Sequence, residues 1–328
     1  MLKLQYLFEN FDLAKECLAL YDADEKNLDR MLSYFRISSN AVYPFRSRTI
    51  GKRCVLRLAP VEERKQADVV SVIRLIEWLI GQGVPAMKPY PMRDGRVYAE
   101  IETAWGRYHV TAYEQVAGET LEDCDGSLAL VRGYGRTLGQ LHVQLKRYPH
   151  AETRPDHASL MAEVRERFSA YHAPAAPIAE WEDVSRELQA LPLSPDVYGV
   201  IHYDFEADNV MYDEETDTFG ILDFDDAVRG WYALDVARAL DCLDDVAEGE
   251  DPQEAKAAFL DGYREVTPFT AEQEATLPLM RRLVRLQEYG TILHVLSEPV
   301  EDEPGWMTDL REELGDRLRC IEELCRER

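Results

Sequence analysis

The chain reads IHYDFEADN over residues 201–209 and ILDFD over residues 221–225, and these two segments say more about its architecture and chemistry than any others. They place Asp204, an asparagine five residues later at Asn209, and Asp223 after a short return strand. Phosphoryl transfer needs a hydroxyl aligned with the γ-phosphate and metal charge held against the phosphate oxygens. One base and two oxygen-donor ligands on neighbouring loops supply both. The spacing therefore predicts a phosphoryl-transfer site.

The composition limits the possible partners. The chain has 328 residues, 46% of them hydrophobic, which is enough for a sizeable core and two lobes. Lys and Arg number 37 against 62 Asp and Glu, for a net charge of −25. A nucleic-acid binder needs a basic face, and an anionic membrane repels an acidic protein, so we expect neither partner. The acidity indicates either attraction of a cationic substrate or a solubility-favouring surface, and its spread along the whole chain favours the second.

Targeting signals are not evident. No apolar run approaches the roughly 18 residues needed to span a bilayer. The first ten residues, MLKLQYLFEN, lack the long apolar core of a signal peptide. The six cysteines are scattered and form no C-x-x-C pair, which is typical of reduced thiols. We therefore predict a cytoplasmic protein.

The apolar pattern changes along the chain. Residues 41–45 and 54–58 read as two strands joined by a turn, and residues 69–80 present one apolar helical face. A second hairpin ends with a strand at residues 108–113, and the remainder is mostly helical. This order predicts an α+β fold with two lobes. We place the lobes and their hinge at residues 1–112, 113–118 and 119–328.

The most specific residues carry a family resemblance. The chain gives His202-Tyr203-Asp204, then Asn209, then Leu222-Asp223-Phe224-Asp225, then Asp235-Val236-Ala237 on a helix. It resembles the aminoglycoside phosphotransferase and choline kinase superfamily, whose members read H-G-D-x-x-x-x-N, I-D-F-x-D and D-L-A in this order. These are small-molecule kinases with a protein-kinase-like fold, so the resemblance implies a small antiparallel-sheet lobe, a larger helical lobe, and ATP and Mg²⁺ as cofactors.

The resemblance assigns roles to the central residues. Asp204 would be the catalytic base that accepts or orients the hydroxyl proton. Asn209 and Asp223 would be magnesium ligands, because hard oxygen donors suit Mg²⁺. Asp225 could support the second metal or the catalytic loop. The competing interpretation is an acidic loop of solvated turns, which five matched positions make much less favourable.

Two further positions in the motif are interpreted as structural. His202 is better explained as a brace for the catalytic loop than as a base. Asp235 is expected to cap the loop or pair with it from its helix. Both interpretations rest on the resemblance.

The nucleotide side is less specific. A phosphate-covering loop is expected just ahead of the first strand, at Ser38, Ser39 and Asn40. It lacks G-x-G-x-x-G, so only backbone N–H groups and small hydroxyls could cradle phosphate, and an ordinary turn would look the same. The connector that would hydrogen-bond adenine contains Tyr113, Glu114 and Val116. A plain linker between lobes would also look the same.

Arg57 aligns with the strand-borne residue that grips the α- and β-phosphates in the resembled family. Arginine supplies a bidentate fork where lysine supplies a point charge, although Arg57 could also be a surface charge on an edge strand. The family's helix glutamate, which points at this residue, falls near Val72 here. Asp68 and Glu77 are possible substitutes at helical spacing, so the ion pair is left open.

Substrate residues are expected in the helical lobe near the base. Glu206 and Asp208 flank the catalytic loop, and Trp231 and Tyr232 follow the metal segment. Carboxylates with an aromatic pair could cage a cation. Arginines on a late helix, among them Arg285, could instead clamp a carboxylate or phosphate. These alternatives predict opposite substrates, and each residue could equally serve packing or a surface ion pair.

Three functions are compatible with these patterns. The first is an ATP- and Mg²⁺-dependent phosphotransferase acting on a hydroxyl of an aminoglycoside, amino alcohol, homoserine or other small metabolite. The second is a Ser/Thr protein kinase. Only residues 226–230 separate the metal turn from Trp231, which leaves no platform for docking a peptide and favours the first. The third is a catalytically silent nucleotide-binding protein, against which the intact Asp204, Asn209 and Asp223 argue.

Overall fold

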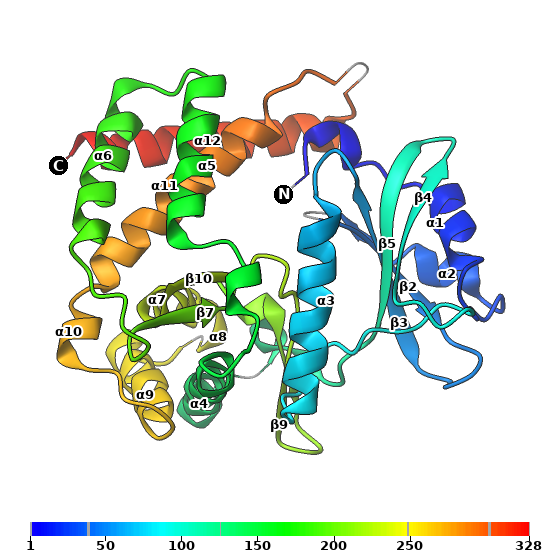
Figure 1. The fold of residues 1–328 in the computed structure, drawn as a ribbon, viewed down its shortest axis with the longest axis horizontal. Coiled ribbons are helices and arrows are strands. Elements are labelled where there is room, and N and C mark those ends of the chain that lie inside the picture. Colours follow the sequence, from blue (N-terminus) through cyan, green and yellow to red (C-terminus); the bar gives the residue numbers. More distant parts are fainter. Residues whose placement is uncertain (1, 38–39, 125, 248, 301–302, 328) are drawn as a thin grey trace.

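The computed structural model describes residues 2–37, 40–124, 126–247, 249–300 and 303–327. A five-stranded antiparallel sheet forms the N-terminal part, with strand order β1-β2-β3-β5-β4 (Figure 1). Its strands are β1 Arg36–Ile37, β2 Ala41–Arg46, β3 Arg53–Pro60, β4 Tyr98–Thr103 and β5 Gly106–Glu114. Two short helices cover one face, α1 Phe11–Leu18 and α2 Leu28–Leu32. The predicted strand pairs are thus present in one sheet.

Helix α3, Gln66–Gly81, stands between this sheet and the helical part (Figure 1). Its apolar face follows the predicted period, and Val72, Ile76 and Leu79 are buried. They belong to the largest core cluster, which extends through the helical part of the protein. Burial of this face therefore fixes α3, and the loop before it, against the catalytic elements.

The C-terminal part is mostly helical, as predicted. Its helices are α4 Leu128–Leu145, α5 His157–Ala170, α6 Ala175–Gln189, α7 Tyr232–Asp241, α8 Leu243–Val246, α9 Pro252–Arg264, α10 Ala271–Glu274, α11 Leu277–Val295 and α12 Gly305–Arg326. Two small sheets lie among them, one of β7 Tyr198–Ile201 with β10 Val228–Trp231, the other of β6 Glu119–Thr120, β8 Val210–Asp213 and β9 Thr218–Ile221. Single turns of 3₁₀ helix complete the fold: η1 Leu4–Tyr6, η2 Leu121–Asp123, η3 Ala151–Thr153 and η4 Ala207–Asn209. The expected α+β class, sheet first and helices after, is confirmed.

The N-terminal segment packs against two late helices, a contact that no local pattern predicts. Leu2, Leu4 and Leu7 form a small core with Val295 and Met307, at the end of the helical part that lies nearest the sheet (Figure 1). The chain therefore begins against α11 and α12 before it enters the sheet, and Ile37 of β1 also packs against this small core. The lobe boundary at residues 113–118 stays a prediction. No described helix is long and apolar enough to cross a membrane.

Candidate active site

Asp235, in the first turn of α7, binds the backbone of the catalytic loop. Its fully buried carboxylate accepts hydrogen bonds from the backbone N–H of His202 at 2.8 Å and of Tyr203 at 2.7 Å. His142 Nε2 lies 3.0 Å from the same group. Burial lowers the pKa of His142 against the opposing effect of Asp235, so the ring is neutral at physiological pH and Nε2 is its donor. These contacts agree with the structural role expected of Asp235.

Tyr203 has a φ of 73°, in the left-handed region that a bulky residue adopts only under constraint. The bond from its N–H to Asp235 supplies one such constraint. His202 supplies another, because its Nε2 lies 2.7 Å from the carbonyl oxygen of Leu222 on the return segment. His202 thus braces the loop against the strand that follows, which is the role expected of it.

Asp204 emerges from this loop with its side chain 29% exposed. Its Oδ2 accepts a hydrogen bond from Asn209 Nδ2 at 2.9 Å, and Nδ2 also donates to the Asp204 carbonyl at 3.0 Å. Both bonds use the amide nitrogen, so the Asn209 Oδ1 is turned away from Asp204 and keeps its lone pairs. The other Asp204 oxygen pairs with Arg238 Nη2, from α7.

Asp223 is also positioned by a hydrogen bond of its neighbour in the chain. The N–H of Leu222 donates to the Asn209 carbonyl at 2.8 Å, which brings the metal segment beside the catalytic loop. Asp223 itself has a φ of 45° and a side chain 34% exposed. A free amide oxygen and a partly exposed carboxylate on adjoining loops are hard donors that fit Mg²⁺, which takes its other ligands from water and phosphate.

Arg57, on β3, reaches across to this metal segment. Its Nη2 lies 3.1 Å from both carboxylate oxygens of Asp223 and 2.8 Å from Asp225 Oδ2. The same Asp225 oxygen accepts from Asn40 Nδ2 at 2.8 Å and lies 3.1 Å from Arg64 Nη1. Burial alone would raise the pKa of Asp225, but Arg57 and Arg64 lower it to about 2. Asp225 is therefore ionised and pairs with both arginines.

The open question of the acidic partner of Arg57 is answered by these contacts. The partners are Asp223 and Asp225, on the metal segment, and α3 supplies none among the described ion pairs. Val72, at the position of the family glutamate, is 1% exposed and packs in the core. Asp68 and Glu77, the suggested substitutes, are on α3 but make no described pair with Arg57. The interpretation of either as its partner is corrected accordingly.

The connector after β5 is tied to the sheet on both sides. The N–H of Glu114 donates to Lys88 O at 2.8 Å, and that of Gln115 to Arg53 O at 3.0 Å. The Glu114 carboxylate pairs with Lys52 and Lys88, and its pKa is lowered by these lysines against burial.

Tyr113 is buried with its ring centroid 5.9 Å from the Arg57 guanidinium, and Val116 packs against Gly220 on β9. These contacts place the connector beside the Arg57 cleft, while its part in binding adenine stays a prediction. Of the expected phosphate loop, Asn40 lies at this cleft, and Ser38 and Ser39 lie outside the described residues.

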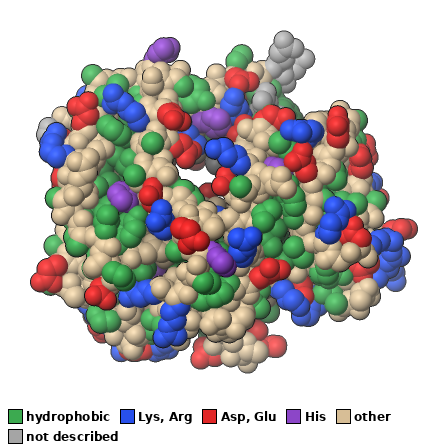
Figure 2. All heavy atoms as spheres, viewed as in Figure 1, with side chains coloured by type: hydrophobic (Ala, Val, Ile, Leu, Met, Phe, Trp, Pro, Cys, Tyr) green, Lys and Arg blue, Asp and Glu red, His purple; other side chains and the backbone are tan. Residues whose placement is uncertain are grey.

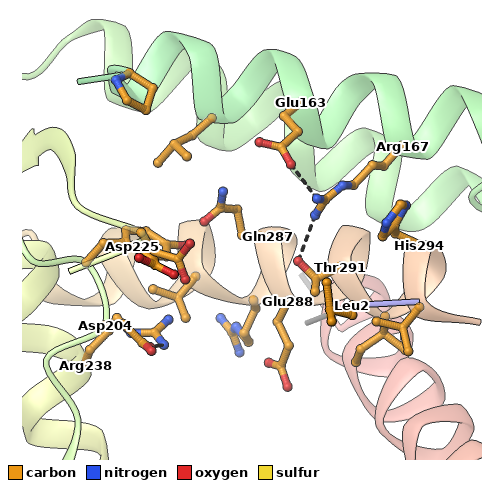
Figure 3. A pocket seen from close by; sticks show the side chains of 18 of the residues that line it. Leu2, Glu163, Arg167, Asp204, Asp225, Arg238, Gln287, Glu288, Thr291 and His294 are labelled. Carbon is orange, nitrogen blue, oxygen red and sulfur yellow. Dashed lines mark hydrogen bonds and ion pairs between the residues drawn. The ribbon is translucent and has the colours of Figure 1, made fainter. Parts of the chain in front are cut away.

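A cavity of about 1980 Å³ opens in front of Asp204. It is seen as the hollow near the middle of the molecule in Figure 2, with acidic and basic side chains at its rim. Asp204, Arg238 and Asp225 lie at one end and Arg167 and Leu2 at the other, with α11 along one wall (Figure 3). A second cavity of about 10 Å³ lies on the other side of Asp225, beside Arg57.

The chain matches the phosphotransferase enzyme family over residues 36–273, which is most of its length. It belongs to that family. Amicoumacin kinase of Bacillus subtilis (strain 168) is 27% identical over 68% of this chain and 69% of its own. Homoserine kinase of Caulobacter sp. (strain K31) is 26% identical over 69% and 72%. A solved amicoumacin kinase, hAmiN, superposes with a TM-score of 0.77 at 20% identity, covering 97% of this chain and 95% of the other.

These similarities confirm the expected family, the kinase-like fold and the class of reaction. The protein is a phosphotransferase of the kind that acts on the hydroxyl group of a small molecule.

The aromatic pair of this phosphotransferase does not face the large cavity. Trp231 is 3% exposed, with its Nε1 donating to Pro192 O at 3.0 Å. Tyr232 is 1% exposed and lies against His142, with ring centroids 4.8 Å apart. Both are core residues, so the interpretation of this pair as an aromatic cage is wrong. The alternative considered at the outset, packing, describes them.

Of the three remaining substrate candidates, two line the large cavity and one does not. Glu206 lines the cavity next to Asp204 and pairs with Arg238 at 2.8 Å, and burial raises its pKa. Arg285, on α11, also lines the cavity. Asp208 is not among the residues that line the cavity, and burial, together with the nearby charge of Asp204, raises its pKa. The structure thus brings Glu206 and Arg285 to the cavity and leaves Asp208 outside it.

Three arginines of the site were not found from the sequence. Arg238 lies three residues after Asp235, one helical turn along α7, and this spacing could have indicated it. Arg154 donates to the carbonyl oxygens of Asp225 at 3.0 Å and Ala227 at 2.7 Å and so braces the metal segment. Arg64 reaches Asp225 from the loop before α3. No local spacing points to Arg154 or Arg64, because their partners are distant in sequence.

Proposed function

We propose that this phosphotransferase moves the γ-phosphate of Mg²⁺-bound ATP to a hydroxyl of a small molecule that carries an amine. The observation that carries the proposal is the position of Asp204, which faces the large cavity while Asn209 and Asp223 adjoin it on the side of Arg57. An acceptor hydroxyl in the cavity and a phosphate beside Arg57 would meet at this point.

The chain's own groups suit the steps of this reaction. Asp204 accepts the hydroxyl proton as the oxygen attacks phosphorus, and Arg238 and Asn209 keep its carboxylate oriented. Arg57 offers its guanidinium to phosphate oxygens in exchange for the two carboxylates it now contacts. Asn209 and Asp223 would hold magnesium, whose charge stabilises the phosphate oxygens when it is bound.

Similar proteins support the nucleotide and the metal. The hAmiN structure is a complex with AMP-PNP and Ca²⁺, and the names of the relatives refer to amicoumacin and homoserine. In this chain the Arg57 cleft is lined by Asn40 and Tyr113, next to the connector expected to meet adenine. These features favour ATP as donor and a small metabolite as acceptor.

The charge of the cavity supports a cationic acceptor. Acidic side chains outnumber Lys and Arg along its lining by thirteen to eight. Arg281, the helical neighbour of Arg285 that an anion clamp would use, pairs with Asp241. Glu206 is 42% exposed and stands beside Asp204. A protonated amine near the reacting hydroxyl would therefore be attracted by carboxylates, and an anionic acceptor would be repelled.

ADP release with Mg·ATP tests the proposal. The panel contains amino alcohols, aminoglycosides, uncharged polyols, hydroxy acids without an amine, and casein. We expect turnover with amine-bearing alcohols and a KM that rises with ionic strength, since the attraction is screened. Phosphorylation of casein alone would instead support a protein kinase. Turnover of a hydroxy acid in preference to its amine analogue would contradict the cationic acceptor while keeping the kinase.

A further inference from the structure

Arg64 lies where the large cavity in front of Asp204 meets the small cavity beside Arg57. Among the described residues, Arg64 and Asp225 line both the small cavity beside Arg57 and the large cavity in front of Asp204. Asp225 is an acid that repels phosphate, so Arg64 is the positive group at this junction. If the proposed function holds, the γ-phosphate lies at this place as it moves to an acceptor in the large cavity.

We propose that Arg64 is a catalytic residue that contacts the γ-phosphate during its transfer, an arginine supplied by the loop before α3. Its Nη1 and Arg57 Nη2 approach the same oxygen of Asp225, at 3.1 Å and 2.8 Å. Two guanidinium groups that share one carboxylate oxygen are spaced to share an oxygen of another anion. Arg57 would hold the inner phosphates, and Arg64 the outermost one.

The backbone of Arg64 is fixed in a way that suits such a role. Its carbonyl oxygen lies 2.9 Å from Nε2 of His109, a buried residue of β5. The His109 Nδ1 lies 2.9 Å from the hydroxyl of Tyr98. One neutral tautomer satisfies both contacts, with Nε2–H donating to Arg64 and Nδ1 accepting from Tyr98. The loop that carries Arg64 is thus anchored to the sheet immediately before α3 begins.

The Arg64 side chain makes ion pairs but is not fully buried. It is 16% exposed, and its Nη2 lies 3.8 Å from Asp226, a half-exposed carboxylate at the mouth of the large cavity. Movement toward a phosphate would therefore exchange one carboxylate for a more highly charged anion. Preorganised positive charge of this kind stabilises a transferring phosphoryl group without reorganisation at the moment of reaction.

In the phosphoryl transfer, one bond to phosphorus forms as another breaks. The acceptor oxygen forms a bond to the γ-phosphorus, the bond from that phosphorus to the β–γ bridging oxygen breaks, and the hydroxyl proton passes to Asp204. ADP departs with the electron pair of the broken bond. Arg64 donates to non-bridging oxygens of the phosphoryl group throughout, whose negative charge is shared among them as it moves.

Nucleotide binding tests the proposal without an acceptor. Titration calorimetry compares AMP-PNP and ADP, each with Mg²⁺, on the wild type, Arg64→Ala and Arg64→Lys. We expect Arg64→Ala to weaken AMP-PNP about tenfold or more, the loss of a charge-assisted contact, and to change ADP less than twofold. Arg64→Lys should recover part of the AMP-PNP affinity, because it keeps the charge but not the fork.

Turnover is the second measurement, made with an acceptor that the panel of hydroxyl compounds identifies. Arg64→Ala should lower kcat by about 10³-fold, in the range of arginines that act on a transferring phosphoryl group. Arg107→Ala is the matched control, since Arg107 is a half-exposed residue at the start of β5 that pairs with Glu100. It should bind and turn over as the wild type does.

The failures of the two proposals are distinguishable. A wild type that binds neither nucleotide would overturn the proposed function itself. A wild type that binds both, with an Arg64→Ala variant that loses AMP-PNP and ADP equally, would show that Arg64 only positions Asp225. Equal and unchanged affinities would also overturn the inference. Arg64→Lys keeps the test decisive if the alanine variant does not fold, as judged by thermal melting.

Discussion

The catalytic loop and the nucleotide side of this protein are built by contacts of very different range. Asp204 and Asn209 are 5 residues apart, and His202 reaches partners 20 and 33 residues away. On the nucleotide side, Arg57 meets carboxylates 166 and 168 residues away. The first set is constrained by spacing, so it can be seen in the sequence. The second depends on how two parts of the fold come together, which no spacing records.

The two regions also differ in what their charges do. The Asp235 carboxylate is fully buried and accepts hydrogen bonds from backbone N–H groups, so its partners are fixed. Arg57 is held by carboxylates that are themselves the expected sites of metal and phosphate. One region is a fixed support and the other is a set of exchangeable ion pairs. Four substitutions test this contrast.

Replacement of the base should have the largest effect. Asp204→Asn keeps the shape of the side chain and its contact with Asn209 but cannot accept the hydroxyl proton. We expect kcat to fall by about 10³-fold, which corresponds to about 4 kcal/mol of barrier. Single-turnover ADP release measures it, and ATP affinity should stay within a few-fold. Glu214→Gln, in the exposed β8–β9 turn, is the control. A variant that retains a tenth of the activity would exclude Asp204 as the base.

Replacement of the support should chiefly affect stability. In Asp235→Asn one carboxylate oxygen becomes an NH₂ group that faces a backbone donor, so a buried N–H of His202 or Tyr203 loses its acceptor. We expect a loss of about 3 kcal/mol in the free energy of unfolding, measured with urea. Asp244→Asn, on the exposed side of α8, should change it by less than about 0.5 kcal/mol. Equal effects of the two substitutions would show that the loop does not depend on Asp235.

The same contrast explains what could be predicted. The sheet and α3 follow from local patterns, whereas the roles assigned to His202 and Asp235 follow from the family resemblance, and the hydrogen bonds of both residues are compatible with those roles. The Arg57 partners follow from no local pattern, because the family places the partner on α3 while the carboxylates here come from the metal segment. Trp231 and Tyr232 were misjudged for a related reason. Aromatic side chains bury as readily as they bind, and only the packing against His142 and Pro192 shows which they do.

Arg57→Lys should have an intermediate effect on the exchangeable region. A lysine keeps the charge and could meet both carboxylates, as the single nitrogen Nη2 of Arg57 does, but it lacks the guanidinium fork that suits phosphate oxygens. We expect the KM for ATP to rise about tenfold and the free energy of unfolding to change little, because the carboxylates keep a cation. Steady-state kinetics at varied ATP measure this. Arg53→Lys, an exposed position on the same strand, should leave KM unchanged. A larger effect on stability than on KM would make Arg57 a support rather than an exchangeable partner.

The smallest expected effect is the pH dependence of stability from Asp225. Its folded-state pKa is about 2, lowered by Arg57 and Arg64 against burial, while an unfolded aspartate titrates near 3.9. A lowered folded pKa means that the unfolded state takes up the proton first, so the stabilisation is complete above about pH 5 and is lost as the pH falls toward 2. By pH 3 the loss amounts to about 1 kcal/mol.

The difference in unfolding free energy between wild type and Asp225→Asn, followed by urea denaturation from pH 7 to 3, isolates this contribution from those of other carboxylates. It should be constant above pH 5 and shrink below it. If the difference stays constant down to pH 3, Asp225 is not an exchangeable anion but a fixed support like Asp235. The distinction between the two regions would then be lost at the residue that joins them.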